Sequence, residues 1–363
     1  MESEIKKLIM VWGLIYVSVN YCYIVAKIIS KGTTRLITFL PVVCLFLVLP
    51  RSLNSVHFGG ATHFFITFLG TFKLLLLAYG MGPLSDPSLS LGHFVSLACL
   101  PIMIQQNPPP LEKPLTSTQH NESLEKPLTS KRGLGSPLNY STKALVWALL
   151  VHGYDYREYL HPRVVKFQLC VHLYITIEMV LAMAAALAQA LLGLKLEPQF
   201  DNPILSTSLQ DFWGRRWNLV CTSILRLAVY NPVFLLSKPI LGHKWAFIPA
   251  LMATFLVSGL MHELVYSNAG HSTPTWKVAQ FFLIHGLCLT VEIVLKKKFS
   301  GMFRLPPVIS GLLTLAFVIH TFARMGLPQL LLSGGLEQTL EELSILGSFV
   351  KHLAQSFTLS LSI

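Results

Sequence analysis

Residues 245–266 read WAFIPALMATFLVSGLMHELVY, and this stretch decides the class of fold. It is long enough to cross a bilayer, because a helix of about 20 apolar residues spans the hydrocarbon core. Apart from the adjacent His262 and Glu263, it carries no charged or imidazole side chain. Ionisable groups inside a membrane helix are costly and are functional candidates by default. The stretch therefore predicts a membrane-spanning helix that carries a candidate active-site pair.

The composition extends this prediction to the whole chain. The 363 residues are 53% hydrophobic and 12% charged, whereas soluble domains carry about 25% charged residues. Residues 8–26 contain no charge, and residues 167–194 contain only Glu178. Because backbone groups in lipid must be satisfied internally, such runs form helices. We expect an all-α, polytopic helical membrane protein with eight to ten transmembrane segments.

The apolar runs place these segments along the chain. They are expected near 8–28, 36–49, 61–81, 91–104, 167–194, 219–237, 245–266, 278–295 and 308–333. The short runs 36–49 and 91–104 are candidates for tilted, half-inserted or interfacial helices, and an amphiphilic tail from about 343 is a further candidate segment.

Among the other charged residues within these runs, Lys73, Glu178, Arg226 and Glu292 each stand alone. We expect internal partners to satisfy each of them, since an unpaired charge in the membrane is expensive. Lys296 lies one helical turn after Glu292 and is its natural partner. Lys73 is expected to pair or to reach a cavity.

One segment breaks the apolar pattern. Residues 105–145 are rich in Pro, Ser, Thr, Lys and Glu and contain the sequence LEKPLTS twice, at 111–117 and 124–130. This composition predicts a hydrophilic, flexible loop. We expect the loop to lie within a single membrane domain, 1–363, rather than to divide two domains.

The formal net charge is +11. The basic residues are spread over short loops between apolar runs rather than gathered in one patch, which argues against a nucleic-acid partner. Two explanations stay open: retention of basic loops on the cytosolic side of the bilayer, and attraction of an anionic substrate. The six cysteines show no metal-type spacing and are expected to be reduced and buried.

On a helix, the side chains of His262 and Glu263 point in different directions. Ser258, His262 and Tyr266 follow at intervals of four residues and share one face, whereas Glu263 points about a quarter-turn away. Burial disfavours the charged imidazole, and a neutral imidazole with one free nitrogen is a competent general base. The alternative is a buried histidine that hydrogen-bonds across helices.

The polar stretch upstream, STSLQDFWGRRWN (206–218), contains further candidate site residues. Its two tryptophans, Trp213 and Trp217, are typical of an interfacial aromatic belt with basic anchors. Arg215 and Arg216 are candidate phosphate ligands, because guanidinium groups match phosphate oxygens bidentately. Asp211, four residues before Arg215, is expected to orient it. Asn218 can both donate and accept hydrogen bonds.

The sequence lacks the motifs of several other enzyme classes. The sequence has no His-x-x-His-His set for a di-iron site, no His-x-x-x-Asp or His-x-x-x-x-Asp acyltransferase motif, no Gly-x-Ser-x-Gly elbow and no P-loop.

SLQDFWGRRWN (208–218) followed by SGLMHE (258–263) resembles the plant wax synthase family, the long-chain-alcohol O-fatty-acyltransferases of the membrane-bound O-acyltransferase (MBOAT) superfamily. The resemblance covers most of the chain. It also includes LPRSLNSVHFGG (49–60), FKLLLLAYGMGPLSDPSLSLGHF (72–94), LEPQFDNP (196–203), TPTWKVAQFFLIHGLCLTVEIVLKK (273–297) and VISGLLTLAFV (308–318).

The resemblance implies an MBOAT-like fold and transfer of an acyl group from acyl-CoA to an alcohol in the membrane of the endoplasmic reticulum. His262 matches the catalytic histidine of the family, and Asn218 matches the second signature position. No metal and no redox cofactor is expected; acyl-CoA is a co-substrate. The residues expected to contact substrate are Asp211, Trp213, Arg215, Arg216, Trp217, Ser258, Glu263 and Tyr266.

Alternatives remain at the level of the acceptor. A long-chain fatty alcohol gives a wax ester, but acyl transfer to a sterol, or acetyl transfer to diacylglycerol, fits the same family. A transporter is a remote alternative, since intramembrane charges also mark transport pathways. No pair of broken helices at matching positions in two halves of the chain supports it.

Overall fold

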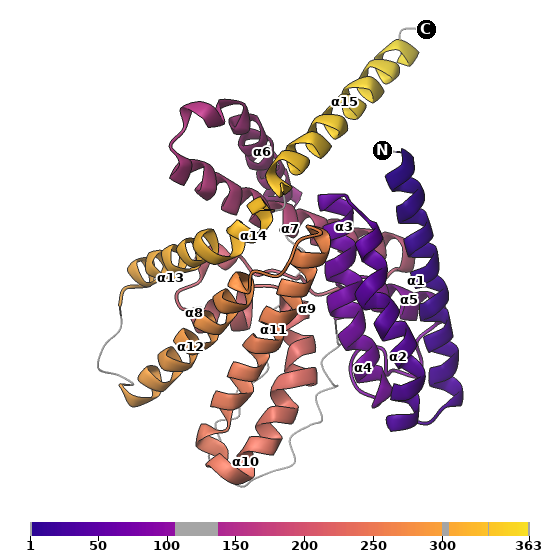
Figure 1. Cartoon of the computed structure of the whole chain (residues 1–363), viewed down its shortest axis with the longest axis vertical. Helices are drawn as coiled ribbons and strands as arrows, with labels where there is room; N and C mark the ends of the chain where they lie inside the picture. The colour runs from indigo at the N-terminus through magenta and orange to yellow at the C-terminus, as the bar shows by residue number, and fades with distance from the viewer. Residues whose placement is uncertain (1, 106–136, 300–304, 333, 362–363) are drawn as a thin grey trace, which may run out of the picture.

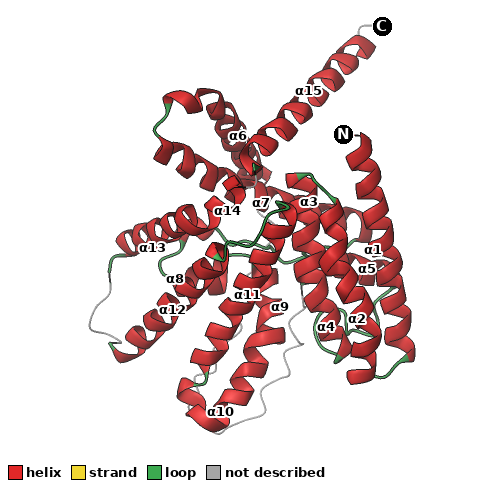
Figure 2. Ribbon diagram, in the orientation of Figure 1, coloured by secondary structure: helices red, strands yellow, loops and turns green. Residues whose placement is uncertain are grey.

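The structure is a computed structural model that describes residues 2–105, 137–299, 305–332 and 334–361. Helices make up most of these residues (Figure 2). The described ranges contain no strand, only an isolated antiparallel bridge between Ile104 and Leu196. The predicted all-α class is confirmed.

The α-helices follow one another along the chain in two groups. Before residue 105 lie α1 (Glu2–Ile28), α2 (Thr33–Val48), α3 (Val56–Thr62), α4 (Thr71–Ala78) and α5 (Leu91–Cys99). From residue 137 onward lie α6 (Pro137–Gly153), α7 (Pro162–Leu192), α8 (Leu209–Asp211), α9 (Leu219–Leu225), α10 (Asn231–Trp245), α11 (Phe247–Ala269), α12 (Lys277–Lys298), α13 (Pro307–Thr321), α14 (Leu327–Leu332) and α15 (Gly335–Leu361).

Shorter helical pieces link these helices. The 3₁₀ turns are Leu49–Ser52, Tyr154–Tyr159 and Pro203–Leu205. The π-helical segments are His63–Gly70, Phe212–Arg216, Arg226–Tyr230 and Phe322–Gly326. A π segment holds one residue more per turn than an α-helix, is rare, and frequently lies at a functional site.

Eight helical stretches within the described residues are long and apolar enough to cross a membrane. They are Glu2–Ile28, Thr33–Ser52, Val56–Ala78, Pro162–Leu192, Leu219–Trp245, Phe247–Ala269, Lys277–Lys298 and Pro307–Leu332. They correspond to eight of the nine predicted runs. The ninth run, 91–104, forms only the nine residues of α5. Leu100 is extended because Pro101 follows it. The predicted tail is helical, as α15, but is not among the eight stretches.

The prediction of a hydrophilic loop over 105–145 is wrong at the C-terminal boundary of the loop. Residues 137–145 already belong to α6, which runs into the apolar stretch that follows. Lys143 in this part of the helix forms an ion pair with buried Glu178 of α7, a contact that composition cannot reveal. The remainder of that prediction, 106–136, lies outside the described residues.

In Figure 1, α1–α5 lie together on one side, α9–α12 occupy the middle, and α15 extends away from the other helices. Helices α11 and α12 approach each other closely at two glycines. A Cβ at Gly259 would lie 3.1 Å from Cβ of Phe282, and one at Gly286 would lie 2.8 Å from Cβ of Phe255. Small residues allow such close approach between membrane helices.

Three of the four isolated intramembrane charges have internal partners. The ammonium of Lys73, which is fully buried, donates to the carbonyls of Leu97 (2.5 Å) and Leu100 (2.7 Å) at the end of α5. Glu292 accepts from Lys296 at 2.6 Å, as predicted, and Glu178 pairs with Lys143. Arg226 is exposed.

Candidate active site

His262 lies on α11 with one ring nitrogen engaged and the other free. Its Nδ1 is 2.7 Å from the carbonyl oxygen of Ser258, one turn earlier. Because a carbonyl only accepts hydrogen bonds, Nδ1 carries the proton and Nε2 carries the lone pair. None of the described residues hydrogen-bonds Nε2. The hydroxyl of Ser258 is 3.5 Å from Nδ1, a much weaker contact. The arrangement is that of a neutral imidazole with an available basic nitrogen.

Aromatic rings from two other elements surround this imidazole. Phe282 of α12 lies 4.3 Å away between ring centroids, and Phe68 and Phe64, from the π segment His63–Gly70, lie at 5.3 and 6.3 Å. Tyr266, one turn after His262, packs in the same apolar cluster as Phe282. The ring itself is half-buried. A base in such a setting is shielded from bulk water on several sides.

Glu263 faces a different element. Its carboxylate is buried and accepts from the backbone N–H groups of Trp276 (2.7 Å) and Ala279 (3.1 Å). These groups belong to the N-terminal end of α12, where unpaired N–H groups and the helix dipole favour a negative charge. Glu263 therefore caps α12 and ties it to α11.

The polar stretch upstream is docked against α12. Ser208 caps α8 by accepting from Asp211 N at 3.1 Å. Glu292 of α12 accepts from the backbone N–H of Leu209 at 2.9 Å. The chain then continues as the π segment Phe212–Arg216, closed by a bond from Trp217 N to the carbonyl of Phe212 at 2.9 Å.

This π segment overturns the expected partner of Asp211. The carboxylate binds Arg216, with Oδ2 2.7 Å from Nε, and not Arg215. A π turn brings residues five apart onto one face, whereas the prediction assumed the four-residue spacing of an α-helix. Arg216 also donates to the carbonyl of Asp201 at 3.1 Å. Arg215 is exposed and binds none of the described residues.

The two tryptophans of the stretch are held by different neighbours. The indole of Trp217 stacks on Phe212, with centroids 5.2 Å apart, and lies 6.0 Å from Tyr174 of α7. The indole N–H of Trp213 donates to Nδ1 of His285, on α12, at 3.0 Å. The side chain of Trp213 thus points into the protein rather than toward an interfacial belt.

Asn218 ends the stretch in a strained backbone conformation. Its φ of 36° lies in the left-handed region, which Asn tolerates better than most residues. Its Oδ1 accepts from Cys221 N at 3.1 Å and so caps α9, while its Nδ2 binds no described residue. Cys221 packs in one apolar cluster with Phe68, a neighbour of the His262 ring. Asn218 and His262 therefore border the same cluster.

Two neighbours of the site were missed from the sequence: His285 and Phe282. His285 stands in an apolar run as His262 does, so the rule that singled out His262 also applies to it. Phe282 has no such signal, because a phenylalanine in an apolar helix is ordinary.

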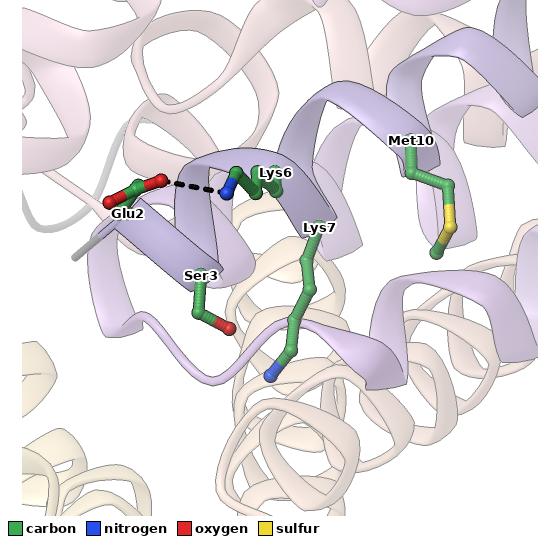
Figure 3. A pocket seen from close by; sticks show the side chains of 5 residues that line it. All are labelled: Glu2, Ser3, Lys6, Lys7 and Met10. Carbon is green, nitrogen blue, oxygen red and sulfur yellow. Dashed lines mark ion pairs between the residues drawn. The ribbon is translucent and has the colours of Figure 1, made fainter.

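The described residues contain no cluster of three or more His, Cys, Asp or Glu side chains that could hold a metal ion. A surface hollow at the start of α1 is open to solvent and is lined by Glu2, Ser3, Lys6, Lys7 and Met10 (Figure 3). Lys6 and Glu2 form an exposed ion pair across it, 2.7 Å long. None of the five touches the residues around His262, so the hollow is no part of the site.

Comparison with known proteins defines the class of the molecule. Residues 196–284, which include both Asn218 and His262, match the model of the membrane bound O-acyl transferase family. The chain is 43% identical to an acyl-CoA–sterol O-acyltransferase of Arabidopsis thaliana, over 96% of this chain and 97% of the relative. It is 38% identical to a long-chain-alcohol O-fatty-acyltransferase of Simmondsia chinensis, over 96% and 97%.

The molecule is thus a multi-pass membrane acyltransferase. It belongs to the plant wax synthase family of the membrane-bound O-acyltransferase superfamily.

Proposed function

We propose that the protein transfers the acyl group of acyl-CoA to the hydroxyl of a long-chain fatty alcohol and so forms a wax ester. The observation that carries the chemistry is the free Nε2 of His262 among aromatic side chains. Both substrates have long apolar chains, and burial of each methylene from water stabilises the complex by about 0.8 kcal/mol.

Transfer proceeds directly between the two substrates. Nε2 of His262 takes the proton of the alcohol hydroxyl as its oxygen attacks the thioester carbonyl. The resulting tetrahedral intermediate expels the CoA thiolate, which takes the proton back from the imidazolium. The products are an ester and CoA, and no metal or redox cofactor takes part. Nδ2 of Asn218 binds none of the residues that the structure describes, and we assign it to donate a hydrogen bond to a polar group of the reacting centre.

The polyanionic CoA is assigned to the side of the protein where Arg215 lies exposed. The Arg215 guanidinium binds no other described residue and is available to phosphate oxygens. Arg216 is committed to Asp211 and to backbone carbonyls, and supports the segment instead. We assign the protein to the membrane of the endoplasmic reticulum, where acyl-CoA is supplied; fluorescent tagging and co-staining with a reticulum marker test this.

A sterol acceptor is the second candidate, because the 43% identical relative bears the name of a sterol acyltransferase. Microsomes from a yeast strain without its own neutral-lipid acyltransferases separate the candidates. Labelled acyl-CoA is supplied with fatty alcohol, sterol or diacylglycerol in parallel. We expect ester from fatty alcohol; product from sterol alone would replace the wax ester proposal, and product from none would remove the acyl-transfer proposal.

His262→Ala tests the mechanism. General base catalysis contributes about 10²–10⁴-fold to rate, so we expect at least a hundredfold loss of kcat with normal membrane insertion. The exposed His243→Ala is the matched control and is expected to keep full activity. Substantial activity in His262→Ala would show that another group takes the proton.

A further inference from the structure

A fully buried histidine, His285, adjoins the site through a series of hydrogen bonds. His285 of α12 is fully buried, and its Nδ1 accepts from the indole N–H of Trp213 at 3.0 Å. Its Nε2 is 2.8 Å from the hydroxyl of Thr321 in α13, which in turn donates to the carbonyl of Phe317 at 2.7 Å. This series of hydrogen bonds joins the π segment Phe212–Arg216 to α12 and α13.

The donor groups at its two ends determine which atom donates in each of these hydrogen bonds. An indole nitrogen only donates, so Nδ1 of His285 is the acceptor and Nε2 carries the proton. Since the hydroxyl of Thr321 donates to a carbonyl, it receives the proton of Nε2 through its lone pair. Both nitrogens of His285 are therefore committed, in contrast to His262, and His285 has no lone pair left for a base.

The packing connects His285 to His262 through aromatic rings. Trp213 lies 5.8 Å from Phe282, and Phe282 lies 4.3 Å from His262, between ring centroids. The ring of His285 is itself packed between Phe281 and Phe317, at 4.2 and 4.9 Å. With its own ring fixed on two sides, His285 holds the indole of Trp213 in one orientation. That indole bounds the space in which Phe282 can move.

We propose that His285 is a positioning residue for acyl transfer: it locks Trp213, and through Trp213 holds Phe282 against the imidazole of His262. The inference rests on the proposed function of His262. It gives Trp213 a role inside the protein and explains why a polar side chain is buried between two phenylalanines. Displacement of a reacting group by about 1 Å reduces rate by about a hundredfold, so kcat is the sensitive quantity.

Two conservative variants separate the two nitrogens of His285. The amide oxygen of Asn occupies the place of Nδ1, one bond from Cγ, and can still accept from Trp213. The amide nitrogen of Gln occupies the place of Nε2 and can still donate to Thr321. Both remove the ring and bury one amide, so they are matched in polarity. His285→Asn removes one methylene more than His285→Gln, so the difference in volume works against the expected order of kcat.

We expect His285→Asn to keep kcat within about threefold, and His285→Gln and Trp213→Phe to lose about ten- to a hundredfold in kcat. The KM values for acyl-CoA and alcohol should change little. The double variant Trp213→Phe with His285→Asn should be no slower than Trp213→Phe alone, because residues of one network are not additive.

Thermal stability in detergent is measured on the same samples, so that kcat is expressed per folded molecule. Equal kcat values for the Asn and Gln variants, whether high or low, would overturn the positioning role. A strictly additive double variant would do the same. If the wild type esterified no acceptor, the proposed function would fail first; an active wild type with equivalent Asn and Gln variants would contradict only the role of His285.

Discussion

The carboxylate of Glu263 accepts two backbone hydrogen bonds from α12, whereas Nε2 of its neighbour His262 is bonded to no residue in the described part of the chain. Adjacent residues on a helix point in directions about 100° apart, so Glu263 belongs to the helix interface, whereas His262 faces the proposed reacting centre. The two should respond differently to substitution.

Glu263→Ala is expected to lower stability more than activity. It leaves the buried N–H of Ala279 and the partly buried N–H of Trp276 without their acceptor, at a cost of about 1–3 kcal/mol. The melting temperature in detergent should fall, while kcat per folded molecule stays near the wild-type value. His262→Ala should give the reverse pattern. A stable Glu263→Ala protein with no kcat would place the carboxylate in the chemistry instead.

Arg215 and Arg216 form a second contrast between neighbours. Arg215→Ala should raise KM for acyl-CoA about tenfold, the effect of one lost charge-assisted hydrogen bond, and leave KM for alcohol unchanged. Arg216→Ala should instead lower the melting temperature, because it breaks the bond to Asp211 and releases the carbonyl of Asp201. An equal rise in both KM values for Arg215→Ala would indicate a structural role.

At the scale of elements, the long apolar runs were predictable because hydrophobic length alone specifies a membrane helix. The partners of Asp211 and Glu263 were not. Asp211 binds Arg216 because a π turn interrupts the segment, and no residue type marks such a turn. Glu263 caps a helix that begins fourteen residues later, and only the fold brings that end to α11. Candidate residues could be named from sequence, whereas their division into reacting and supporting groups required geometry.

Gly259→Ala tests the close approach of α11 and α12. The new methyl group would lie 3.1 Å from Cα of Ala279 and from Cβ of Phe282. Overpacking costs about 1–3 kcal/mol, and here it pushes Phe282 away from His262. We expect lower kcat and lower stability together, measured by esterification and thermal unfolding. Gly60→Ala in α3, where nothing lies within 4 Å, is the control and should be neutral. Unchanged kcat and stability in Gly259→Ala would show that α11 and α12 can move apart without cost.

At the scale of the whole molecule, side chains of the last helix join it to the first group of helices. Glu342 of α15 accepts from Val56 N at 2.8 Å and from the His57 ring at 2.6 Å. Burial alone would raise the pKa of Glu342, but the hydrogen bonds from His57 and Val56 outweigh it and leave the pKa below its ordinary value. The carboxylate thus caps the N-terminus of α3 from the far end of the chain.

A carboxyl with a lowered pKa stabilises the folded state above its unfolded pKa, and this contribution is lost as the pH falls through the native value. Attachment of α15 should therefore weaken as the pH falls below about 4.3, the ordinary pKa of Glu. Limited proteolysis between α14 and α15 measures this. Glu342→Gln should be cleaved faster already at pH 7, while the exposed neighbour Glu341→Gln should match the wild type. No difference between the two variants would contradict the contact.

The π segments also govern how the protein tolerates changes in length. Each holds one residue more than an α-helix of the same rise, so removal of a single residue there would leave a regular helix and keep the residues beyond it in register, whereas the same deletion within a regular α-helix would rotate everything beyond it by about 100°. In His63–Gly70, the π geometry sets the spacing of Phe64 and Phe68, the pair that faces His262, so a deletion between these two would still alter the site. These membrane helices are therefore expected to accept a single-residue deletion within a π segment outside the site more readily than one in the regular helix beside it.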